Sequence, residues 1–151
     1  MPRISAGLLM FRRSQGGTQV FLVHPGGPFW KKKDLGAWTI PKGEIDHGED
    51  DLTAARREFQ EETGARSEGP FIELGEIKQP AGKFVRAWAF EGDCSTKITS
   101  NTFSIEWPPK SGRQQEFPEV DRAEWFSLEE AHKRIHRGQE AFLDRLMAKI
   151  E

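Results

Sequence analysis

The stretch from Gly43 to Ala65, GEIDHGEDDLTAARREFQEETGA, has the most informative pattern in this chain. Its middle has the periodicity of an amphipathic helix, because apolar residues recur three and four positions apart. These apolar residues are Leu52, Ala55 and Phe59. A glycine, Gly64, follows at the position where helices commonly end. We therefore expect a helix between Gly48 and Thr63 that packs one face on a core.

A second face of this helix is acidic. Glu61 and Glu62 follow Glu58 by three and four positions, so the three carboxylates share one side of the helix. Glu49 precedes the helix and joins them if the loop folds back, and Arg57 can orient one carboxylate. Clustered carboxylates repel one another at neutral pH, and hard oxygen ligands favour Mg²⁺ or Mn²⁺ over zinc. A glutamate-rich helix is more often a solvated surface, but the spacing of the whole segment favours a metal site.

The segments around this helix indicate further strands and helices. Residues Ile4 to Arg13 and Thr18 to His24 predict a hairpin, and a long loop runs from Pro25 to Lys42. More strands are expected at Ile72–Lys78, Phe84–Glu91, Phe103–Trp107 and Val120–Phe126. After Ser127, a candidate N-cap, a helix is expected that breaks near Gly138 and then resumes. This order predicts an α/β fold, a sandwich with a mixed central sheet, as a single domain over residues 1–151.

The composition argues against several classes of protein. A net charge of −2, from 22 basic and 24 acidic residues, gives no basic excess of the kind that binds duplex DNA or RNA. No apolar run approaches the roughly 20 residues that span a membrane, and the N-terminus lacks a signal-peptide pattern. Cys94 is the one cysteine, so it has no internal disulfide partner. We therefore expect a cytoplasmic protein without membrane or duplex nucleic-acid partners, whereas the oligomeric state is not predicted.

The stretch from Gly43 to Ala65 resembles the Nudix box, G-x5-E-x7-R-E-U-x-E-E-x-G-U, in which U is a bulky apolar residue. Both glycines, the arginine and the four glutamates match. The departures are at packing positions, where Phe59 is aromatic and Ala65 is small. The preceding Trp38–Gly43 segment, WTIPKG, and the later Glu124–Phe126 segment also resemble the family. The resemblance implies the α/β/α sandwich of Nudix hydrolases and cleavage of a diphosphate linkage with Mg²⁺, or alternatively Mn²⁺, as cofactor.

The resemblance also implies roles for the residues of the box. Glu61 and Glu62 are expected as metal ligands, and Glu58 as a ligand or as the general base. Glu49 is expected either as a ligand through water or as the ion-pair partner of Arg57. For Arg57, alignment of the glutamates is expected rather than contact with the substrate.

Two further roles implied by the resemblance lie at the edges of the box. The backbone carbonyl of Gly43 or of Lys42 is expected to complete the metal shell. Family members take the general base from the box or from a loop before the last strand, where this chain has Glu116 and Glu119. Glu119 is the preferred loop candidate, and an ordinary exposed acid on a polar loop is the alternative interpretation.

Substrate contacts are expected from basic and aromatic residues outside the acidic face. Lys42 and Lys83 are candidates for contacts to phosphate oxygens, although a lysine in a turn is usually only solvated. Trp30 precedes the run that begins at Lys31, KKK, in the long loop. This loop can grip a polyphosphate while the indole stacks on a base, and a simple solvated loop is an equally good interpretation.

The resemblance leaves the substrate class open. A nucleoside diphosphate linked to a group X is expected, with nucleoside and dinucleoside polyphosphates as the leading class. ADP-ribose or another ADP-sugar is the alternative, because Pro80 stands at the offset past the box where ADP-ribose-cleaving members have a proline. The absence of tyrosine argues against family signatures that use a downstream Tyr. A non-catalytic nucleotide-binding Nudix domain is also considered, but such domains usually lose box carboxylates.

Overall fold

A computed structural model describes residues 4–150 of the chain. Its centre is a six-stranded sheet in the order β4-β5-β1-β2-β8, with the short strand β3 paired to β1. The strands are β1 (Ile4–Ser14), β2 (Gly17–Pro25), β3 (Lys42–Glu44), β4 (Ile72–Lys78), β5 (Phe84–Glu91) and β8 (Val120–Ser127). β1 and β5 run parallel, whereas β1–β2, β2–β8 and β4–β5 run antiparallel. The predicted mixed sheet is therefore confirmed.

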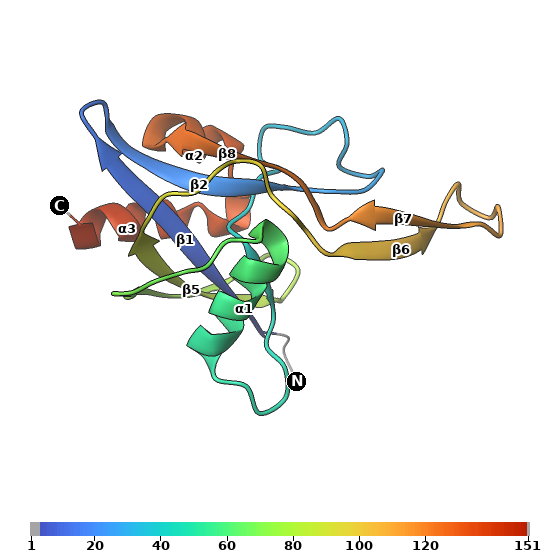
Figure 1. Cartoon of the computed structure of the whole chain (residues 1–151), viewed down its shortest axis with the longest axis horizontal. Helices are drawn as coiled ribbons and strands as arrows, with labels where there is room; N and C mark the ends of the chain where they lie inside the picture. The colour runs from blue at the N-terminus through green and yellow to red at the C-terminus, as the bar shows by residue number, and fades with distance from the viewer. Residues whose placement is uncertain (1–3, 151) are drawn as a thin grey trace.

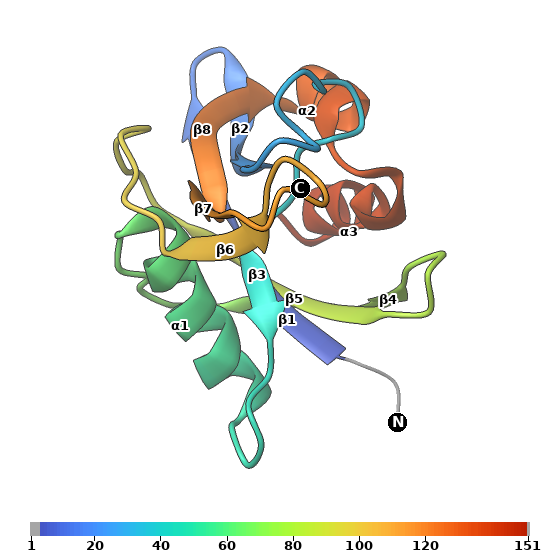
Figure 2. The same cartoon turned by 90° about the vertical axis from the view of Figure 1, so that its right-hand side faces the viewer.

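Helices cover both faces of this sheet (Figures 1 and 2). One face carries α1 (Asp51–Thr63), and the other carries α2 (Leu128–Arg134), the short 3-10 turn η1 (Arg137–Gln139) and α3 (Ala141–Ile150). Side chains of a strand alternate between the two faces, and β1 does so clearly. Leu8 and Met10 pack with Phe59 of α1, whereas Leu9 and Phe11 pack with Leu146 of α3. The structure is the α/β/α sandwich that the sequence predicts.

The ends of α1 follow from its capping residues. The side chain of Asp50 accepts a hydrogen bond from the backbone N–H of Thr53, so the helix begins at Asp51, a little later than predicted. Gly64 ends the helix with a φ of 78°, a left-handed conformation that glycine adopts without strain. The predicted C-terminal end is confirmed. These caps fix where α1 begins and ends.

Two strands were not predicted from the sequence. β3 consists of three residues and forms by pairing with β1, beside the start of the glutamate-rich segment. β7 (Gln114–Pro118) pairs with β6 (Thr102–Glu106) in a separate two-stranded arm that projects from the body of the molecule (Figure 1). Most side chains of β7 are exposed, so it lacks a pattern of alternating burial. Within residues 4–150, no helix is long and apolar enough to cross a membrane.

Candidate active site

Arg57 is the centre of an ion-pair network on the acidic face of α1. Its Nε donates to Glu49 Oε2 at 2.8 Å, and its Nη2 donates to Glu49 Oε1 at 3.0 Å. Its Nη1 donates to Glu58 Oε1 at 2.8 Å and to Glu61 Oε2 at 3.2 Å. The hydrogen bond to Glu49, with smaller contributions from Glu58 and Glu61, raises the pKa of Arg57 above its usual value. The loop before α1 therefore folds back, and one guanidinium holds three glutamates together.

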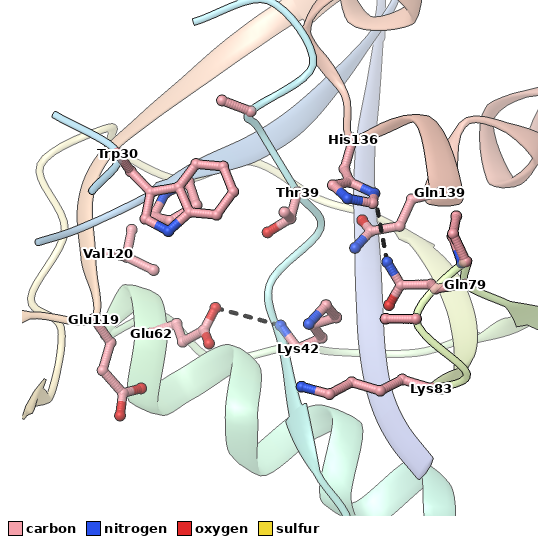
Figure 3. Close-up of a pocket in the computed structure, with 14 residues that line it drawn as sticks. Trp30, Thr39, Lys42, Glu62, Gln79, Lys83, Glu119, Val120, His136 and Gln139 are labelled. Carbon is pink, nitrogen blue, oxygen red and sulfur yellow. Dashed lines mark hydrogen bonds between the residues drawn. The ribbon is translucent and has the colours of Figure 1, made fainter. Parts of the chain in front are cut away.

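Glu62 lies on the other side of this acidic face, toward the sheet. Its Oε1 accepts a hydrogen bond from the backbone N–H of Lys42 at 3.3 Å (Figure 3). The pKa of Glu62 is raised to about 8, first by burial and then by the charges of Glu58 and Glu119, against the attraction of Lys42. The pKa of Glu58 is also raised, first by burial and then by Glu61 and Glu119, although Arg57 opposes this. These carboxylates are thus close enough to repel one another.

A pocket of about 450 Å³ opens beside Glu62. Figure 3 shows Trp30 and Val120 on one side, Glu62 and Glu119 below them, and Lys42 and Lys83 next to the carboxylates. Pro25, Ala37, Pro80 and Ala81 add apolar surface, so that the pocket has an aromatic and apolar part next to a charged part. Pockets with this combination suit ligands that have one apolar and one anionic end.

The structure brings many of the predicted site residues together. Glu62, Glu119, Lys42, Lys83 and Trp30 all line the pocket. The other predicted residues belong to the ion-pair network of Arg57 and to the adjoining strand β3. They are Gly43, Glu49, Arg57, Glu58 and Glu61. Lys31 and Glu116 are exposed and do not line the pocket.

The donor chemistry of the acidic face fits a hard divalent cation. Glu58, Glu62 and Glu119 are oxygen donors, and the pKa values of Glu58 and Glu62 are raised first by burial and then by neighbouring carboxylates, a repulsion that a bound cation would relieve. Within residues 4–150, however, no three Asp, Glu, His or Cys side chains converge as a finished metal cage. Glu58 and Glu61 point to Arg57 instead.

Several residues of the pocket were not predicted from the sequence, and Gln79, His136 and Gln139 are three of them. Gln79 belongs to the turn between β4 and β5, and His136 and Gln139 belong to the segment around η1. The backbone N–H of His136 donates to the carbonyl of Trp38 at 2.6 Å, which brings the C-terminal segment to the long loop. No short-range pattern in the sequence indicates this contact, because the two segments are far apart along the chain.

Comparison with known proteins shows the family. The NUDIX domain model matches residues 1–146, so the chain belongs to the Nudix family. Among its relatives is an RNA pyrophosphohydrolase of Rhizobium meliloti, 37% identical over 110 residues, which cover 62% of this chain and 60% of the relative. Another is the asymmetrical bis(5'-nucleosyl)-tetraphosphatase of Rattus norvegicus, 43% identical over 98 residues, 58% of this chain and 63% of the relative. The matches to these two curated relatives thus span less than two thirds of their length.

Solved structures confirm the fold. The Ap4A hydrolase of C. elegans, in a binary complex, superposes with a TM-score of 0.68 at 23% identity and covers 97% of both chains. The NUDIX domain of Shewanella oneidensis NrtR, complexed with ADP ribose, gives a TM-score of 0.70 at 14% identity, over 100% of this chain and 90% of that one. At these identities the likeness establishes the fold of the chain and not its substrate.

Proposed function

We propose that this chain is a metal-dependent pyrophosphohydrolase that cleaves the diphosphate linkage of a nucleoside diphosphate joined to a group X. The observation that carries this proposal is the position of the complete glutamate set of the Nudix box beside a pocket with two lysines and a tryptophan. A non-catalytic Nudix domain is disfavoured, because each box carboxylate is present. We propose one domain over residues 1–151 and a cytoplasmic location.

The proposed metal site uses the carboxylates of Glu58, Glu61 and Glu62, the carbonyl of Gly43 and, through water, Glu49. Mg²⁺ or Mn²⁺ bound there would neutralise phosphate charge and lower the pKa of an attacking water. Nudix proteins generally use divalent ions such as Mg²⁺, which agrees with this set of oxygen ligands.

The other residues of the pocket position the substrate and move the proton. Glu119 lies at the pocket next to Glu62 and is our preferred base, which accepts the proton of the attacking water. Glu58 and Glu61 are the alternative bases. Lys42 and Lys83 contact phosphate oxygens and offset their charge. Trp30 offers a face on which a nucleobase stacks.

The leading substrates are nucleoside and dinucleoside polyphosphates. Two of the curated relatives are named for an RNA pyrophosphohydrolase and for a dinucleoside tetraphosphatase. The lysine pair in the pocket suits a chain of several phosphates. Lys31, in the exposed loop next to Trp30, is proposed as an additional contact for a phosphate tail that leaves the pocket.

ADP-ribose is the second candidate substrate, and one observation favours it. Pro80 lies in the wall of the pocket, so a proline at this offset is in contact with the space where the substrate would bind. A turn position also accounts for this proline, because proline favours turns.

A substrate panel tests the proposal. Purified protein is incubated with Mg²⁺ and with nucleoside triphosphates, dinucleoside polyphosphates, a 5'-triphosphorylated RNA oligonucleotide and ADP-ribose, and phosphorylated products are quantified. Hydrolysis that stops with EDTA and returns with Mg²⁺ supports the proposal, and the rates rank the substrates. Binding of these ligands without turnover of any of them would instead assign the chain to the non-catalytic class.

A further inference from the structure

One end of the pocket is built from polar groups that the proposed reaction does not use. His136 lies there as the N-cap of η1, and its Nδ1 accepts a hydrogen bond from the backbone N–H of Gly138 at 3.0 Å. Because a backbone N–H can only donate, Nδ1 must carry a lone pair, and the proton of the neutral ring is on Nε2. Nε2 has no hydrogen-bond partner among the described residues, and it lies on the side of the ring away from Gln79 (Figure 3).

Gln139 lies next to His136, and its side chain also has a donor without a partner among the described residues. Its side chain is fully buried, and its Oε1 accepts a hydrogen bond from the backbone N–H of Ile40 at 3.0 Å. This bond fixes the orientation of the amide, because the backbone group can only donate. The Nε2 of Gln139 is buried without a partner among the described residues, which is costly unless an acceptor comes within reach. The carboxamide faces the pocket (Figure 3).

Lys42 connects this end of the pocket to the acidic face. Its charge acts on Glu62 and also lowers the pKa of His136, after the larger effect of burial. Its own pKa is lowered first by burial and then by the neighbouring charge of Lys83. Figure 3 shows Lys42 between Glu62 and the neutral donors of His136 and Gln139, with Lys83 next to it. This sequence of groups, acids then cations then neutral donors, follows the pocket wall in Figure 3.

We propose that His136 and Gln139 form a phosphate subsite that binds a second phosphate of the substrate, beyond the phosphate held at the carboxylates. This inference rests on the proposed function, because it divides one polyphosphate chain between the two ends of the same pocket. The two lysines favour a phosphate over the uncharged edge of a nucleobase. Nε2 of Gln139 is not exposed on the pocket surface, so it joins the subsite after a small shift of the side chains in front of it.

A metal-free binding experiment separates this subsite from catalysis. Tripolyphosphate is titrated into the full chain in EDTA, and binding is followed by calorimetry and by the NMR signals of the His136 ring. His136→Asn keeps an oxygen that accepts the Gly138 N–H, and its shorter side chain places no N–H at the position of the ring Nε2. We expect its dissociation constant for tripolyphosphate to rise on the order of tenfold, the usual effect of one hydrogen bond to a charged group.

The matched control is His132→Asn, four residues earlier in α2. His132 pairs with Glu140 and does not line the pocket, so this variant should bind like the wild type. Gln139→Glu is the second variant: it keeps the acceptor for Ile40, replaces the unpartnered donor with an oxygen and should also weaken binding. If His136→Asn does not fold, the affinity of Gln139→Glu for tripolyphosphate tests the subsite instead.

Two results would overturn the subsite. One is unchanged tripolyphosphate affinity in folded His136→Asn or, if that variant does not fold, in Gln139→Glu. The other is a shift of the His136 ring signals by adenosine or guanosine and none by tripolyphosphate, which would make this end of the pocket a base site. Neither depends on turnover. It is a distinct outcome if the protein hydrolyses no substrate of the panel while its variants lose affinity for tripolyphosphate. That combination would support the subsite and contradict the proposed reaction.

Discussion

The carboxyl group of Glu58 fills the space next to Gly43 in which any other residue would carry its Cβ. A Cβ built on Gly43 lies 2.0 Å from Cδ of Glu58, and both carboxyl oxygens are within 2.4 Å of it. β3 and α1 therefore approach each other at a residue without a side chain. The position of Glu58, and through Arg57 that of Glu49, depends on this glycine.

Gly43→Ala should displace Glu58 and lower activity. The added methyl group forces the carboxylate or β3 to move, at a cost of about 1–3 kcal/mol in unfolding free energy. We expect turnover to fall by on the order of 100-fold, because a small misplacement of catalytic groups is costly. Gly16→Ala is the control, since its built Cβ meets nothing closer than 3.9 Å. Wild-type turnover in Gly43→Ala would show that the position of Glu58 is not important.

Arg57→Lys should weaken metal binding more than folding. A lysine cannot make the two parallel hydrogen bonds that Arg57 makes to Glu49, so the loop before α1 loosens. We expect the Mg²⁺ concentration for half-maximal rate to rise about 10-fold or more, the usual effect of removing a group that orients ligands. Arg56→Lys, on the neighbouring exposed residue, is the matched control. Equal Mg²⁺ dependence in the two variants would contradict this role.

The stability of the metal-free protein should fall as pH rises through neutrality. Glu62 has a pKa of about 8 in the folded state against an ordinary value of 4.5, so between these values the folded state holds a proton that the unfolded state has lost. Stabilisation from this group is present at low pH and is lost as pH rises toward 8. Glu62→Gln should therefore raise Tm in EDTA at pH 8 by on the order of 5 °C.

Thermal unfolding at several pH values in EDTA measures this effect. At pH 5 the wild type and Glu62→Gln should differ little, since Glu62 is protonated in the folded wild type. Added Mg²⁺ should raise Tm at pH 8 more in the wild type than in the variant. A lower Tm for the variant at pH 8 would mean that the buried carboxylate is not a destabilising charge.

His24 should control the loop that carries Trp30. The His24 ring is fully buried; its Nε2 donates to the carbonyl of Lys33 at 2.6 Å, and its Nδ1 contacts Asp121 at 2.8 Å. His24→Leu removes both contacts, so we expect faster trypsin cleavage between Lys31 and Lys33 and a KM several-fold higher, with a smaller change in kcat. His47→Leu, in the exposed loop before α1, is the control. An unchanged cleavage rate would show that other contacts hold the loop.

The sequence predicts α1 well because its signals are local. The apolar spacing, the acidic face and Gly64 all lie within one segment, and the structure confirms the helix and its C-terminal end. β3 could not be predicted, because a strand of three residues has no periodicity and depends on pairing with β1. β7 was missed for a related reason, since its exposed side chains lack an alternating pattern.

The same difference between local signals and tertiary contacts applies to the residues of the candidate site. The glutamates of α1 and their arginine follow from spacing, and the resemblance to the Nudix box adds the lysine before it. His136 and Gln139 reach the pocket through a tertiary contact between Trp38 and the C-terminal segment, which no local pattern contains. Trp30 lines the pocket but its neighbour Lys31 does not, because the loop turns the lysine outward to solvent.

The most direct test of the central claim compares Glu62→Gln with Glu68→Gln under Mg²⁺, on the best substrate of the panel. Glu68 is exposed and lies outside the pocket, so its variant should hydrolyse at the wild-type rate. Glu62→Gln should keep a cooperative thermal transition and lose turnover by at least about 100-fold, as expected when a metal ligand is removed. Wild-type turnover in folded Glu62→Gln would contradict the claim that this acidic face holds the catalytic metal.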